Sequence, residues 1–247
     1  MVSAVNTTGE HSDRGLRRAA RDIITLTEPL FDALAELAEA CRRDVDLTLP
    51  RPFDDEASWS AFAPAADHVL RTHVLATGVG AAVIGEESAD GTASMAWWIR
   101  RDGHVSRKRH VMNPQSDSFY DVRHLRWFRV PMATGRPALF GPYVDSWGTD
   151  DITLTAAVAL IVDDRRVGVV AADLDTRQYL DLAEAVLRET GVSALLDDED
   201  RVVVSSDPSI DTGSRIASLG QAVTGRETID ELNWSLARLG GQSANRS

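Results

Sequence analysis

The chain has little cysteine, little lysine and no long apolar run. Its single cysteine, Cys41, excludes an internal disulfide and a metal cluster built from several thiolates of one chain. No segment reaches the ~20 consecutive apolar residues of a membrane-spanning helix, and the polar N-terminus lacks the apolar core of a secretory signal. We therefore expect a soluble protein in the cytoplasm, a reducing compartment.

Positive charge is also scarce. The 247 residues include 26 Lys and Arg against 38 Asp and Glu, which gives a formal net charge of −12. Such an excess of negative charge repels nucleic acids and anionic membrane surfaces, so neither is an expected partner. Lys108 is the only lysine, and this preference for arginine is typical of a GC-rich bacterial genome.

The motifs of common enzymes are missing as well. The sequence has no glycine-rich nucleotide-binding pattern and no Gly-x-Ser-x-Gly nucleophile. His68 and His73 are five residues apart, so on a helix they do not share the face that two metal ligands need. The acidic loop that begins at Asp145 does not match a calcium-binding loop. We expect no catalytic residue, no metal and no cofactor.

Apolar periodicity divides the chain into five parts. Residues 1–14 are expected to be a disordered lead-in and residues 241–247 a disordered tail. Residues 15–76 form a helical segment, whose long amphipathic helix carries Pro29 and is expected to kink there or restart with Thr27 as N-cap. Residues 77–176 alternate short β-branched runs with turn residues, which predicts an antiparallel sheet. Residues 177–240 form a helix plus a hairpin, either a shortened second module or the completion of the same sheet.

Aromatic residues are concentrated in one stretch. Nine of the fifteen lie between residues 97 and 147, namely Trp97, Trp98, Phe119, Tyr120, Trp127, Phe128, Phe140, Tyr143 and Trp147. Ring faces attract an ammonium group, and the carboxylates of Asp145 and Asp173 accept its hydrogen bonds. The pattern therefore indicates a pocket for a small cation. Packing of the rings between sheet and helices explains the same composition.

A family resemblance favours the pocket. The segment WFRVPMATGRPALFGPYVDSWGTDDITLTAAVALIVDDRRVGVVAADLDT, residues 127–176, resembles the ligand-binding half of a Cache sensor domain, a PDC-type, extended PAS-like fold. The resemblance covers about residues 15–210, and TGVSALLDDEDRVVVSSD is similar to the start of the second module in double Cache proteins. It implies an α+β fold, with a PAS-like antiparallel sheet flanked by a long N-terminal helix and an aromatic-rich helix that ends near Trp127.

The amine and amino-acid binding subset of that family gives the candidate site. Its ligand-binding positions correspond here to Tyr120, Trp127, Phe128, Tyr143, Asp145 and Asp173. The family's arginine, which holds the carboxylate of an amino acid, is replaced by Leu125, with Arg123 and Arg126 beside it. The resemblance therefore implies a site for an amine, a diamine or, if one of these arginines substitutes, an amino acid.

These observations predict a binding or sensor protein of signal transduction rather than an enzyme. Its expected partners are a small cationic or zwitterionic metabolite, a separate regulatory or transport protein, and a second copy docked through the N-terminal helix. The basic run Arg100–His110 is expected to be a solvated hairpin or a docking surface. Two alternatives stay open: an enzyme that uses Asp145 and Asp173 as acid and base, and a structural module without a ligand.

Overall fold

The computed structural model describes residues 6–49, 59–85, 93–144 and 152–240, with side chains from residue 13 onward. These residues form two compact units, one of residues 28–176 and one that combines the chain before residue 28 with residues 177 onward. Each unit has its own antiparallel sheet. Within the described residues, no helix is both long and apolar enough to cross a bilayer.

The unit of residues 28–176 is built on a six-stranded sheet with the order β3-β2-β1-β6-β5-β4. The strands are β1 (Ala76–Val83), β2 (Ser94–Arg101), β3 (His104–Lys108), β4 (Ala138–Val144), β5 (Ile152–Val162) and β6 (Arg165–Leu174). All neighbours pair antiparallel. This arrangement confirms the predicted α+β, PAS-like class.

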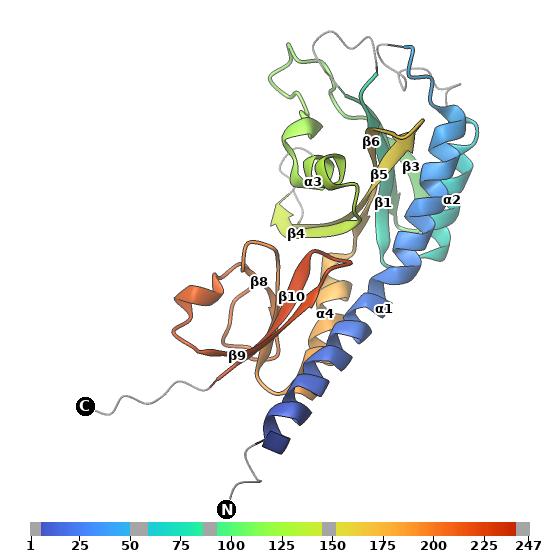
Figure 1. The fold of residues 1–247 in the computed structure, drawn as a ribbon. Helices are drawn as coiled ribbons and strands as arrows, with labels where there is room; N and C mark the ends of the chain where they lie inside the picture. The colour runs from blue at the N-terminus through green and yellow to red at the C-terminus, as the bar shows by residue number, and fades with distance from the viewer. Residues whose placement is uncertain (1–5, 50–58, 86–92, 145–151, 241–247) are drawn as a thin grey trace, which may run out of the picture. The chain divides into compact units, whose positions relative to one another are not determined.

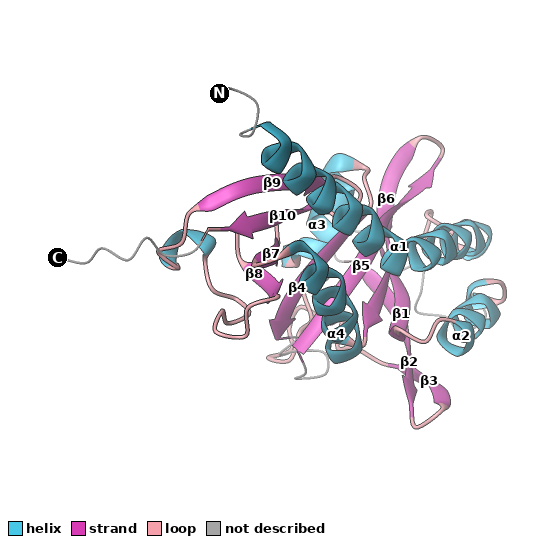
Figure 2. Ribbon diagram, turned by 90° about the horizontal axis from the view of Figure 1, so that it is seen from below, coloured by secondary structure: helices cyan, strands magenta, loops and turns pink. Residues whose placement is uncertain are grey.

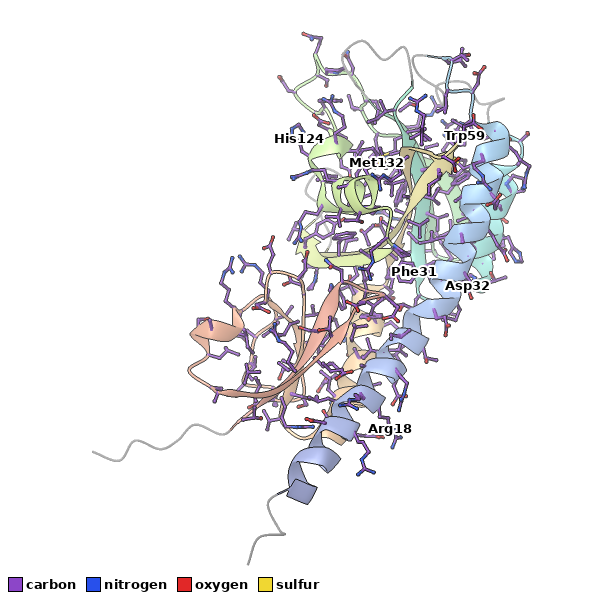
Figure 3. All side chains as sticks on the ribbon, in the orientation of Figure 1. Arg18, Phe31, Asp32, Trp59, His124 and Met132 are labelled. Atoms are coloured by element: carbon purple, nitrogen blue, oxygen red, sulfur yellow. The ribbon has the colours of Figure 1, made fainter. Side chains whose placement is uncertain are left out.

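Helices cover both faces of this sheet. Helix α2 (Phe62–Thr72) packs on β1 and β2, and α3 (Arg126–Thr134) packs on β4, β5 and β6. Figure 1 shows α2 and the later part of α1 on one side of the sheet and α3 on the other. Figure 3 places Trp59 on the α2 side and Met132 on the α3 side. Since side chains alternate along a strand, the neighbours Trp97 and Trp98 contribute to opposite layers.

Helix α1 (Asn6–Asp44) is longer than the sequence suggests. It begins at Asn6, so residues 6–14, which we expected to be disordered, are helical. It also continues through Pro29, because this proline lies on the exposed face, where water solvates the carbonyl that loses its N–H partner. Thr27 is therefore no N-cap, and its hydroxyl instead donates to the carbonyl of Ile24 at 3.1 Å.

The apolar seam of α1 is buried within the chain itself. Leu30, Leu34, Leu37 and Cys41 are at most 3% exposed, and burial raises the pKa of the Cys41 thiol. The seam that suggests a homodimer from sequence is thus already covered by this chain's own residues.

The second unit contains α4 (Thr176–Leu187), which follows directly after β6, and a four-stranded sheet with the order β8-β7-β10-β9. Its strands are β7 (Ser193–Leu196), β8 (Val202–Ser205), β9 (Val223–Ile229) and β10 (Trp234–Leu239), and Figure 2 shows them in magenta beside α4. The hairpin after residue 190 is thus part of a separate sheet. Strands β9 and β10 extend it with residues that the sequence analysis left unassigned.

A carboxylate from the end of α1 caps the start of α2. Asp44 accepts backbone hydrogen bonds from Ala61 at 2.8 Å and from Phe62 at 2.7 Å, and a further bond from the hydroxyl of Ser60 at 3.1 Å. The first N–H groups of a helix have no partner inside the helix, and the helix dipole favours negative charge there. Asp44 therefore fixes the position at which α2 begins.

We expect Asp44→Ala to lower the free energy of unfolding by about 1–2 kcal/mol, because it leaves these N–H groups without their acceptor. Chemical denaturation followed by circular dichroism measures this change. Asp67→Ala is the matched control, since it removes an exposed carboxylate of α2 that pairs with the exposed Arg71. Equal destabilisation by the two variants would show that Asp44 is not a cap.

Candidate functional site

Strand pairing brings residues from five strands to one face of the large sheet. Lys108 pairs with Trp97, and Trp97 pairs with Gly80. Gly78 lies two residues before Gly80 on β1. It pairs with Asp173 on β6, which in turn pairs with Thr155 on β5. Directly paired residues of antiparallel strands point to the same face, as do residues two apart on one strand. The two rows therefore share the face that α3 covers.

Two glycines make room for an indole on this face. A Cβ atom at Gly80 would lie 2.2 Å from Cε3 of Trp97, and one at Gly78 would lie 2.7 Å from its Nε1. The Trp97 ring therefore lies against the backbone of β1, in space that any other residue would fill. The Gly78 Cβ position is also 3.3 Å from Oδ2 of Asp173, so the indole N–H is near this carboxylate.

A short hydrogen-bond chain holds the Asp173 carboxylate. The hydroxyl of Thr155 donates to Oδ1 of Asp173 at 2.8 Å, and the Tyr143 hydroxyl lies 2.8 Å from the same Thr155 oxygen. If Thr155 donates to Asp173, then Tyr143 donates to Thr155, which fixes the direction of the chain. Thr155 is fully buried, whereas Asp173 and Tyr143 are half-buried. The chain orients the carboxylate without neutralising its charge.

Aromatic residues from α3 and from the segment after β3 cover this carboxylate. The rings of Trp97 and Trp127 lie 5.8 Å apart, and those of His110 and Tyr120 lie 4.8 Å apart. Together they border a narrow cavity. The cavity is lined by Met95, Trp97, Lys108, His110, Tyr120, Trp127, Tyr143 and Asp173.

Four of the six residues predicted from the sequence line this cavity: Tyr120, Trp127, Tyr143 and Asp173. Phe128 does not, since it packs in the core beside Trp127 at a ring distance of 6.2 Å. Asp145 lies outside the described residues, and so does its suggested pairing with Asp173 as acid and base. The aromatic cluster thus forms both a core and the wall of a cavity.

The arginines suggested as substitutes at the position of Leu125 do not line the cavity. Arg123 makes a bidentate contact with Asp121, at 2.9 and 3.0 Å, and its guanidinium lowers the pKa of that carboxyl. Arg126 lies over the ring of Phe140 at 6.0 Å. Leu125 itself directly precedes α3 and packs against the core. Helix α3 begins at Arg126. The aromatic-rich helix that we expected to end near Trp127 therefore begins there instead.

Sequence reasoning missed Lys108 and His110 at this site. It placed both in a solvated basic hairpin, and a hairpin of β2 and β3 is indeed present, with Arg101 and His104 exposed. Lys108 and His110 are half-buried instead, because pairing with Trp97 turns Lys108 toward the cavity. The Asp102-Gly103 dipeptide is a strong hairpin signal, and both residues have positive φ here. Using that signal would have predicted β3 and its register.

His110 is a cavity residue whose pKa is strongly lowered. Burial, and secondly the nearby Lys108 ammonium, lower the pKa of His110 from 6.5 to about 4. Its Nδ1 is buried and has no hydrogen-bond partner among the described residues. The imidazole is therefore neutral at pH 7, with a buried polar atom available to a bound molecule. No group of three or more metal-ligating side chains is found in the described part of the chain.

We expect the ring signals of His110 in an NMR titration to move near pH 4. Because the folded-state pKa lies below the unfolded value, the folded protein is destabilised as pH falls from about 6.5 to about 4, by up to about 3 kcal/mol. His110→Gln should remove this part of the pH dependence of stability. A His110 signal that titrates near pH 6.5 would contradict the buried, neutral imidazole.

The comparisons with known proteins agree on the fold. The sequence matches no protein-family model and no curated protein. Among solved structures, the ligand-binding domain of the Pseudomonas aeruginosa amino-acid chemoreceptor PctC, in complex with GABA, matches with a TM-score of 0.59 and 17% identity over 95% of this chain and 100% of that chain. The domain of the Pseudomonas fluorescens chemoreceptor CtaA, in complex with L-valine, matches with a TM-score of 0.57 and 15% identity, over 92% and 94%.

The extracellular domain of a histidine kinase matches as well, with a TM-score of 0.55 and 13% identity over 95% of this chain and 94% of that one. These identities are low, so the likeness concerns the fold. Each match spans nearly the whole of both chains, including both units of this protein. The chain therefore has the fold of the Cache sensor domains that its sequence resembles.

Proposed function

We propose that the chain is a sensor domain that binds a small amine-bearing metabolite in the cavity beside Asp173. The observation that carries this proposal is the oriented carboxylate of Asp173, held by Thr155 at 2.8 Å within an aromatic enclosure. A bound ammonium would donate a charge-assisted hydrogen bond to this oriented carboxylate, the stronger kind of hydrogen bond.

The shape of the site suits a small ligand. Two indoles and two phenols line it, and their ring faces stabilise a cation that is removed from water. The cavity is narrow, which favours an amine or amino acid over a larger metabolite. Structures of similar fold contain GABA and L-valine, which are both of this size.

The two units have different roles in this proposal. The unit of residues 28–176 binds the metabolite, and the unit with the four-stranded sheet is a second, shorter module of a double Cache arrangement. Binding is proposed without turnover, and the bound state is passed on to a separate partner. We retain the cytoplasm as the proposed compartment, although one structure of similar fold is an extracellular domain.

A thermal-shift screen against the twenty L-amino acids, GABA and simple amines tests the proposal. A bound metabolite stabilises only the folded state, so the melting temperature rises with its concentration. Asp173→Asn should weaken binding of the selected compound about 10- to 100-fold, because it removes a charge-assisted hydrogen bond. Its fold should persist, since the Asn side-chain oxygen still accepts from Thr155.

Asp164→Asn is the matched control for this experiment. It makes the same chemical change at an exposed turn between β5 and β6, where φ is 60° and Asn is well tolerated. Its affinity should equal that of the wild type. The proposal fails if no compound shifts the wild-type melting temperature, or if both variants bind like the wild type.

A further inference from the structure

The cavity carries opposite charges on its two sides. Asp173 on β6 lines one side, and Lys108 on β3 lines it from the edge of the sheet. In the order β3-β2-β1-β6, three strand spacings separate their backbones, a distance of about 14 Å. A small molecule bound in this cavity can contact both the Asp173 carboxylate and the Lys108 ammonium.

His110 adds a neutral hydrogen-bonding group beside Lys108. Lys108 lies near enough to disfavour the protonated form of His110, so the two side chains are neighbours within the cavity wall. The buried Nδ1 of His110 has no partner among the described residues, and a neutral imidazole donates a hydrogen bond from one of its nitrogens. An ammonium and an imidazole N–H together suit a carboxylate and disfavour a second positive charge.

We infer that Lys108 is a specificity-determining residue of this site, which selects metabolites with a carboxylate opposite their ammonium group and excludes diamines. This inference rests on the proposed function, because it identifies the residue that recognises the carboxylate of the same amine-bearing ligand. It places carboxylate recognition on β3, opposite Trp97, and not at the start of α3 or just before it, where Leu125, Arg123 and Arg126 do not line the cavity.

The register of β3 directs Lys108 toward the cavity. Lys108 is half-buried in the last position of an edge strand, and the neighbouring Arg107 points to the opposite face, over the rings of Trp59 and Trp98.

The test compares each binding amino acid with the amine that lacks its carboxylate. For L-valine the amine is isobutylamine, and for GABA it is propylamine; the acids isovalerate and butyrate complete the sets. Calorimetry should show that the wild type prefers the zwitterion at least tenfold over the amine, and that it does not bind putrescine. Lys108→Met should remove this preference by weakening the zwitterion about tenfold or more, while amine affinity stays equal or rises.

Two further variants separate charge from position. Lys108→Arg should retain most of the preference, because it keeps the cation. Arg101→Met removes an exposed cation of the same hairpin and should change no affinity by more than about twofold. Melting curves establish that each variant is folded before its affinities are compared.

A second measurement does not depend on any variant. Since Lys108 is the only lysine, reductive ¹³C-methylation labels one side chain besides the N-terminus and keeps its charge. The dimethyl signal of Lys108 should shift when the zwitterion binds and should move much less with the matched amine.

The outcomes distinguish the two proposals. Wild-type protein that binds neither zwitterions nor amines contradicts the proposed function itself. Three results would overturn the role of Lys108 and leave amine binding intact. The wild type could bind amines or diamines as tightly as the matched zwitterions, or Lys108→Met could keep the preference for the zwitterion. The third result is a Lys108 signal that does not shift when the zwitterion binds.

Discussion

The packing of one indole against bare backbone is the constraint on which the site depends. Trp97 lies across β1 because Gly78 and Gly80 have no side chains, and a Cβ at either position would come within 3 Å of the ring. The ring thereby fills the space between the edge strands and β6 and leaves the Asp173 carboxylate at the bottom of a hollow. With larger residues on β1, the indole would stand off the sheet and the hollow would close.

The same face combines apolar packing with polar function. Trp127 and Tyr120 are each at most 5% exposed and belong to the hydrophobic core cluster, yet they also line the cavity. The two explanations of the aromatic cluster, core packing and ligand binding, are therefore compatible. One part of each ring contributes to the stability of the sheet and helix, and another part borders the empty space beside Asp173.

Much of this architecture follows from sequence, and the exceptions have physical causes. Alternation and turn residues predict β5, β6 and their hairpin, and the resemblance places Tyr120, Trp127, Tyr143 and Asp173, all of which line one cavity. Composition alone predicts that the whole basic run Arg100–His110 is solvated, Lys108 included. Strand pairing instead turns successive residues of this run to opposite faces of the sheet, which brings Lys108 to the cavity. The continuity of α1 through Pro29 depends on which side of the helix is exposed, which only tertiary packing decides.

The small residues of this face also limit how the cavity can change. Gly78 and Gly80 on β1 are followed by Ala82, and Ala171 and Ala157 continue the same layer on β6 and β5. These strand positions already carry glycine or alanine, so shortening them offers little additional space for a larger ligand. Divergence toward larger molecules has to proceed through the walls, by shortening Trp97, Met95 or the rings contributed by α3.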